Sequence, residues 1–116
     1  MKDSLPEAAA LGRLGNLYQQ YRQGDRASNL EEAIASYTAA LSVYTREAFP
    51  EKGALTQNNL GVAYSNRIRG EKAENIEMAI ASFTAALTVY TREVFPKKGV
   101  QTQNNLATAY SDRIRG

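Results

Sequence analysis

The sequence contains no cysteine, no histidine and no tryptophan. The absence of cysteine excludes disulfide bonds, thiol nucleophiles and thiolate metal sites. The absence of histidine removes a common ligand of zinc and the side chain that titrates nearest neutral pH. Only carboxylate, tyrosine or lysine chemistry remains open. We therefore expect that the chain is not an enzyme and holds no catalytic residue, cofactor or metal.

A strong excess of charge and long apolar runs are missing as well. The 14 basic and 12 acidic side chains leave a formal net charge of +2, which does not favour a nucleic-acid partner. No segment approaches the roughly 20 apolar residues that span a bilayer, and no apolar signal segment follows the charged start. The 43% of hydrophobic residues is ordinary for a folded protein. We expect a cytoplasmic protein without membrane association.

An internal repeat with an offset of 46 residues dominates what is present. Residues 24–70 align with residues 70–116, and about 33 of the 47 aligned pairs are identical. A weaker third copy precedes them, because the segment from Leu14 to Tyr18 matches the segments 60–64 and 106–110. The sequence therefore predicts a single repeat domain. The predicted units are 7–52, 53–98 and a half unit, 99–116.

Apolar residues recur at steps of three and four in every copy, as in amphipathic helices. The clearest stripes place one tyrosine of each copy, Tyr44 and Tyr90, among core positions. No strand pattern occurs. The predicted helices are 7–22, 29–48, 54–69, 75–94 and 100–115.

Turn and capping signals separate these predicted helices. Gly24, Gly70 and Gly116 stand where left-handed C-terminal caps are expected. Pro50 and Pro96 lie beyond the second helix of each unit, which they cannot extend.

Two further signals accompany them. Gly53 and Gly99 are expected to complete the turns after the prolines. Ser28 followed by Glu31 offers a capping box for the helix after Gly24.

A single helical hairpin cannot bury its apolar stripe, so neighbouring hairpins must stack and share a core. The expected fold is all-α, an α-solenoid of antiparallel helical hairpins with about two and a half repeats and five helices.

The positions of several residues resemble a known repeat signature. Leu60-Gly61, an aromatic at Tyr64, alanines on both sides of Phe83, and Pro96 follow one another in the order of the tetratricopeptide repeat. The resemblance implies a superhelical scaffold that binds proteins or peptides. The usual unit has about 34 residues, and we attribute the extra length here to longer helices.

Other motifs resemble a long-repeat variety of the tetratricopeptide family that is common in bacterial regulatory proteins. These motifs are Tyr44-Thr-Arg-Glu-Ala-Phe-Pro50, Thr56-Gln-Asn-Asn-Leu-Gly61 and Arg67-Ile-Arg-Gly70. Such arrays are often fused to caspase-like or nucleotide-binding effector domains. The resemblance does not identify a partner.

In this family the first helix of each hairpin lines the concave face, where a partner segment lies. By position, that face is polar and rich in amides, which can donate to and accept from a peptide backbone. The face comprises Arg13, Asn16, Gln20, Asn58, Asn59, Val62, Ser65, Asn66, Asn104, Asn105, Thr108, Ser111 and Asp112. The alternative is that the amides bond to the turns of neighbouring hairpins and only stiffen the stack.

One known mode of the family grips a terminal carboxylate with two asparagines and several cations. Asn16 and Asn59 occupy matching positions, but Gly12, Gln101 and Asn105 stand where that mode has cations. The sequence therefore argues against this specificity.

Repeated arginines form a candidate rim of the predicted groove: Arg67, Arg69, Arg113 and Arg115. They could hold acidic groups of a partner. The better interpretation is that they pair with Glu47, Glu93 or other nearby acidic residues close to helix ends.

A second hypothesis is structural. The last predicted helix has no second helix after it, which would leave Leu106, Ala109, Tyr110 and Ile114 uncovered. An exposed apolar stripe favours a homo-oligomer, so the chain could be a self-associating segment of a longer repeat protein.

Overall fold

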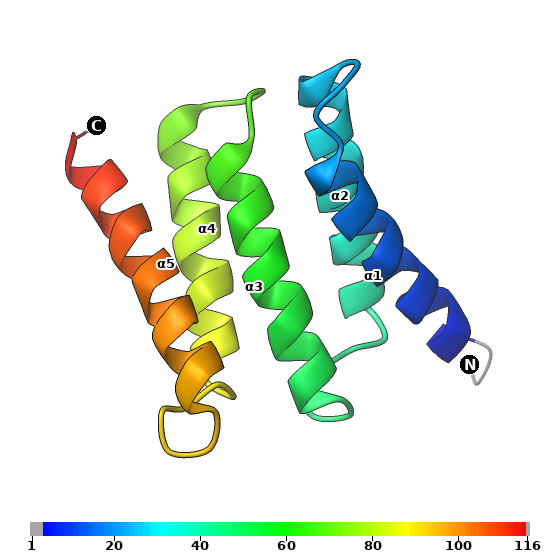
Figure 1. Cartoon of the computed structure of the whole chain (residues 1–116), viewed down its shortest axis with the longest axis vertical. Coiled ribbons are helices and arrows are strands. Elements are labelled where there is room, and N and C mark those ends of the chain that lie inside the picture. The colour runs from blue at the N-terminus through cyan, green and yellow to red at the C-terminus, as the bar shows by residue number, and fades with distance from the viewer. Residues whose placement is uncertain (1–3, 116) are drawn as a thin grey trace.

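The computed structural model describes residues 4–115, which form five helices and no strand (Figure 1). The helices are α1 (Ser4–Gln20), α2 (Arg26–Leu41), α3 (Pro50–Asn66), α4 (Lys72–Leu87) and α5 (Pro96–Arg115). Each packs against the next in sequence order, so the all-α prediction is confirmed. The arrangement is compatible with a helical repeat array.

The helices lie in two layers. α2 contacts α1 and α3, and α4 contacts α3 and α5, whereas α2 and α4 do not touch each other. The first helices of the units also meet, α1 with α3 and α3 with α5. The thinnest extent of the molecule is 20 Å, about two helix diameters.

The hydrophobic core shows the same 46-residue repeat as the sequence. One cluster joins Ala33 and Tyr37 of α2 to Leu60 and Ala63 of α3. Its copy, 46 residues later, joins α4 to α5. Two further clusters, also related by this offset, contain Tyr44 and Tyr90, so the prediction that both tyrosines are buried is confirmed.

The second helix of each unit is shorter than predicted, because α2 ends at Leu41 and α4 at Leu87. The hydroxyl of Ser42 donates to the carbonyl of Ala39 at 2.7 Å, and Thr88 donates in the same way at the end of α4. Such side chains compete for helix carbonyls and favour termination. The extra length assigned to these helices lies instead in the connections 42–49 and 88–95.

The prolines begin the following helices. Pro50 and Pro96 are the first residues of α3 and α5, where a missing backbone N–H costs nothing. Gly53 and Gly99 therefore lie within helices and do not complete turns, which corrects that prediction. At Gly53 a Cβ would lie 2.8 Å from the carbonyl oxygen of Tyr44, so the connection can press closely against α3.

The caps also differ from the expectation. Asp25, and not Ser28, is the N-cap of α2, and its carboxylate accepts from the backbone N–H of Ser28 at 3.2 Å. Gly24 and Gly70 have positive φ angles of 77° and 82°, so the left-handed conformation is confirmed. They stand immediately before the N-caps of the next helices, Asp25 and Glu71, and not at a C-cap. Gly116 lies outside the described residues.

Candidate binding surfaces

A groove between α1 and α3, with α2 as its floor, brings together three of the predicted face residues. Arg13 and Asn16 line it from α1, and Asn59 lines it from α3. The cavity has a volume of about 190 Å³. We call it the α1–α3 groove.

An amide and tyrosine network forms one wall of this groove. The hydroxyl of Tyr37, a fully buried side chain of α2, donates to Asn16 Oδ1 at 2.6 Å. Asn59 Nδ2 donates to the same oxygen at 3.2 Å, and Gln19 Nε2 donates to the Tyr37 oxygen at 3.0 Å. Burial raises the pKa of Tyr37 to about 12, so the phenol stays protonated and keeps donating.

Two cations and no carboxylate line the described part of the α1–α3 groove. Arg13 is exposed on α1, and the ammonium of Lys52 lies 5.9 Å from the centroid of the Tyr44 ring. The sequence interpretation missed Lys52. The repeat contains a signal for it, because the copy, Lys98, lies 5.5 Å from the ring centroid of Tyr90.

A second amide pair joins α3 to α5, since Asn105 Nδ2 donates to Asn58 Oδ1 at 3.2 Å. Together with Asn16 and Asn59, this pair links the three first helices side by side. The amides thus contact neighbouring first helices, and not the turns that the stiffening alternative named. Each amide group still has polar atoms that these bonds do not use.

The remaining predicted face residues do not gather at one site. Val62 packs against the core cluster of α4 and α5. Asp112 helps to line a separate cavity beside Arg67. The exposed ones are Gln20, Ser65, Asn66, Asn104 and Thr108, and Ser111 is half-buried.

Arg67 forms a two-pronged ion pair between α3 and α2. Its Nε and Nη2 donate to the two carboxylate oxygens of Glu31 at 2.7 and 2.8 Å, and its Nη1 donates to buried Asn75 at 3.1 Å. The bonds from Arg67 lower the pKa of Glu31, and the carboxylate raises the pKa of Arg67. This arginine is engaged in holding two helices together.

The other rim arginines follow the same pattern in part. Arg69 lies 3.7 Å from Asp25, and Arg113 lies 2.8 Å from Glu77. Three of the four rim arginines thus pair with nearby acidic residues, as the second interpretation expected. The partners belong to the second helices and their caps, and none of them is Glu47 or Glu93. Arg115 is exposed at the end of α5.

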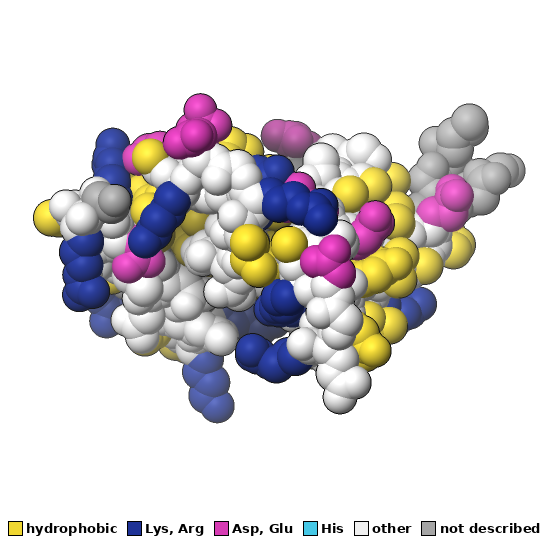
Figure 2. Space-filling model, turned by 90° about the horizontal axis from the view of Figure 1, so that it is seen from above, with side chains coloured by type: hydrophobic (Ala, Val, Ile, Leu, Met, Phe, Trp, Pro, Cys, Tyr) yellow, Lys and Arg dark blue, Asp and Glu magenta, His cyan; other side chains and the backbone are white. Residues whose placement is uncertain are grey.

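Two exposed apolar side chains lie at helical spacing on α1, and a third at the same spacing follows directly after its last residue. Leu14, Leu17 and Tyr21 are 42%, 64% and 55% exposed. Figure 2 shows hydrophobic side chains gathered toward the end of the molecule where Figure 1 places α1. We call these three residues the α1 outer stripe.

On α5, by contrast, two residues expected to be uncovered are packed. Ala109 is 3% exposed and Leu106 is half-buried, because α4 covers both. Tyr110 and Ile114 are exposed, at 42% and 86%. The predicted open stripe is thus correct for only part of the last helix.

Comparisons with family models, with curated proteins and with solved structures found no match. Within residues 4–115, no helix is both long enough and apolar enough to cross a membrane.

Proposed function

We propose that the chain is a protein-interaction module of the long tetratricopeptide kind, which holds a segment of a partner protein in the α1–α3 groove. The single observation that supports this most strongly is the convergence there of Arg13, Asn16 and Asn59. These residues come from two helices and belong to the face that the family resemblance implies for binding.

The chemistry of the groove favours an acidic, extended segment. Asn16 keeps its Nδ2 donors and Asn59 keeps its Oδ1 acceptor, so the two amides offer the complementary pair that a peptide group needs. Arg13 and Lys52 add positive charge without a lining carboxylate. A carboxylate of the partner would find charge-assisted donors here.

Selection of peptides from a random displayed library, followed by affinity measurement with variants, tests this proposal. Selected peptides should be acidic, and Arg13→Ala together with Lys52→Ala should weaken binding about tenfold or more, since each lost charge-assisted bond is worth about 1.5–3 kcal/mol. Arg22→Ala is the matched control, because Arg22 is an exposed arginine at the end of α1 outside the groove lining. Equal affinity of the groove variant and the control would refute the proposal.

Self-association is a second candidate function, favoured by the α1 outer stripe. Leu14 and Leu17 correspond by the repeat to Leu60 and Ala63 of α3, which α2 covers completely or nearly so. The corresponding surface of α1 has no such cover among the described residues. A second copy of the chain could bury this stripe.

A further inference from the structure

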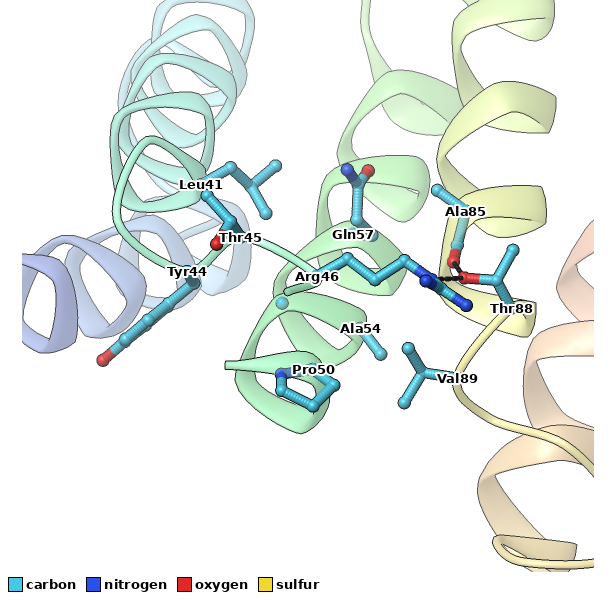
Figure 3. A pocket seen from close by; sticks show the side chains of 11 residues that line it. Leu41, Tyr44, Thr45, Arg46, Pro50, Ala54, Gln57, Ala85, Thr88 and Val89 are labelled. Carbon is cyan, nitrogen blue, oxygen red and sulfur yellow. Dashed lines mark hydrogen bonds between the residues drawn. The ribbon is translucent and has the colours of Figure 1, made fainter. Parts of the chain in front are cut away.

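A second pocket lies on the opposite side of α3, between α2 and α4 (Figure 3). Its walls come from the end of α2 and the connection after it, from the first turns of α3, and from the last turn of α4. Ala54 and Gln57 of α3 face it, whereas Lys52 and Asn59 face the α1–α3 groove. We call it the Arg46 pocket.

The pocket is apolar inside and cationic at its mouth. Leu41, Ala54, Ala85 and Val89 provide apolar lining, and Arg46 extends across the opening toward α4 (Figure 3). No carboxylate belongs to the described lining. The volume is about 230 Å³, below the roughly 300–1,000 Å³ of pockets that enclose drug-sized ligands. The space suits a side chain and its neighbouring backbone better than a whole metabolite.

Arg46 is held in place but keeps most of its donors. Its Nε donates to Thr88 Oγ1 at 2.9 Å, and that hydroxyl donates to the carbonyl of Ala85 at 2.7 Å. Within residues 4–115 no carboxylate lies within ion-pair distance of Arg46, unlike Arg67, Arg69 and Arg113. The two terminal nitrogens therefore remain able to bind one carboxylate through both of its oxygens.

The repeat supplies an incomplete copy of the same pocket. Leu87, Tyr90, Thr91, Arg92 and Gln103 line a cavity at positions 46 residues after their counterparts. The counterpart of the α4 wall is missing there, so Arg92 has no counterpart of Thr88 among the described residues. The two pockets thus share an arginine, but the copy is less enclosed and has the carboxylate of Glu93 in its lining.

We propose that the Arg46 pocket binds an acidic–aliphatic pair of neighbouring residues in a partner polypeptide. The aliphatic side chain lies against Leu41, Ala54 and Val89, and the carboxylate binds the terminal nitrogens of Arg46. Charge complementarity selects this occupant, because the mouth offers a guanidinium held above an apolar floor, and no acidic side chain of the described residues pairs with it. The site lies on the other side of α3 from the α1–α3 groove. Of the described lining residues the two share only Tyr44, and the proposed contacts do not use it.

Titration of the isotope-labelled chain with the capped peptide acetyl-Gly-Glu-Leu-Gly-amide, followed by NMR, tests the proposal. The amide signals of residues 41–46 and 85–89 should shift in a saturable way. Replacing glutamate by glutamine in the peptide, or Arg46→Gln in the protein, should each weaken binding about tenfold, as expected for the loss of a charge-assisted pair. Circular dichroism would establish that Arg46→Gln is folded.

Arg92→Gln is the matched control, and it should leave the affinity unchanged because its pocket lacks the third wall. No saturable shift up to about 10 mM peptide would overturn the proposal, since even a weak specific site of a few kcal/mol is filled at that concentration. Equal effects of Arg46→Gln and Arg92→Gln would overturn it too. Shifts confined to Arg13, Asn16 and Asn59 would contradict this inference while supporting the proposed function.

Discussion

Two glycines of α1 differ in what surrounds them, although they are only three residues apart. A Cβ added to Gly15 would lie 2.6 Å from Cε1 of Tyr37, whereas nothing lies within 4 Å of a Cβ added to Gly12. Gly61 approaches Phe83 in the same way in the next unit, at 2.5 Å. Gly15 and Gly61 thus allow an aromatic ring of the second helix of a unit to lie directly on the backbone of the first helix.

We predict opposite effects of alanine at these two positions. Gly15→Ala should lower the free energy of unfolding by about 1–3 kcal/mol, because a tightly packed ring must move. Gly12→Ala should raise it by about 0.5–1 kcal/mol, because alanine is the better helix former where space is open. Urea denaturation measures both. Equal destabilisation by the two substitutions would show that Tyr37 does not rest on Gly15.

The protonation of Tyr37 predicts a loss of stability at high pH. Its folded pKa of about 12 lies above the ordinary tyrosine value of 10.0, so the stabilising contribution is complete below pH 10. It disappears as pH rises through about 12, because the unfolded chain releases the proton first. The two-unit difference corresponds to roughly 2–3 kcal/mol. Urea denaturation of the parent chain between pH 9 and about 12 measures it.

Tyr37→Phe provides the comparison for this titration. The variant should lose less stability over the same pH range than the parent chain, because other groups titrate equally in both. Phenylalanine is compatible with the position, since Phe83 occupies it in the next unit. Identical pH profiles for the two proteins would mean that Tyr37 is not held protonated by burial.

At the scale of single elements, the starts of α2 and α4 provide a controlled comparison. Asp25 caps α2 with bonds to the backbone and hydroxyl of Ser28, whereas Glu71 precedes α4 and makes no side-chain cap bond. Hydrogen bonds from Ser28 lower the pKa of Asp25. The copies therefore differ at the same place in the unit, where Asp25 makes two hydrogen bonds with Ser28 and has Arg69 at 3.7 Å.

We predict that Asp25→Ala lowers the melting temperature at neutral pH and that Glu71→Ala changes it little. Because the folded pKa of Asp25 is lowered, its contribution is present above the unfolded value near 3.8 and is lost as pH falls below it. The difference between Asp25→Ala and the parent chain should therefore vanish in acid. Thermal denaturation followed by circular dichroism tests this. A difference that persists undiminished in strong acid would contradict the capping role.

Two groups of exposed apolar residues lie toward the ends of the molecule, the α1 outer stripe at one end and Tyr110 and Ile114 of α5 at the other (Figure 1). The α1 outer stripe contains three neighbouring residues at helical spacing, whereas on α5 the packing of Leu106 and Ala109 leaves a smaller open surface. Association should therefore involve α1 more than α5, which revises the expectation based on the last helix.

We predict that Leu17→Glu prevents self-association and that Ile114→Glu leaves it intact. Leu17→Glu would place a carboxylate without a partner in the interface, and burying such a charge is costly. Ile114 is 86% exposed and has few neighbours with which an apolar interface could form. Sedimentation over a concentration series measures the association. A parent chain that stays monomeric at the highest concentration would rule out this second function.

Much of the fold follows from local pattern. Helix number, helix order and the burial of Tyr44 and Tyr90 depend on apolar spacing, which is encoded in neighbouring residues. The apolar pattern predicts ends of α2 and α4 that lie too far along the chain, because it continues through Tyr44 and Tyr90. In the structure Ser42 and Thr88 bond back to helix carbonyls, and both helices end before them. Both tyrosines belong to the connections after these helices, and their side chains reach the core from there.

The candidate binding surfaces depend more than the helices do on contacts between distant parts of the chain. Asn16 and Asn59 could be assigned to one face, since periodicity orients residues around a helix. The sequence could not predict the hydrogen bond between these two amides, the place of Lys52 in the groove, or the pairing of Arg67 with Glu31. Each of these features depends on side chains from different elements. The Arg46 pocket likewise exists only where three elements meet.

The sequence by itself determined that this chain is a repeated set of helices without thiol or imidazole chemistry, because composition and a 46-residue offset are properties of the chain alone. Only the tertiary structure decided which surfaces are open and which arginines, among the described residues, pair with a carboxylate. Arg46 and Arg67 look alike in sequence, but Arg67 meets a carboxylate on α2 whereas Arg46 meets a hydroxyl on α4. Partner choice of this kind depends on distances between helices, which no local pattern specifies.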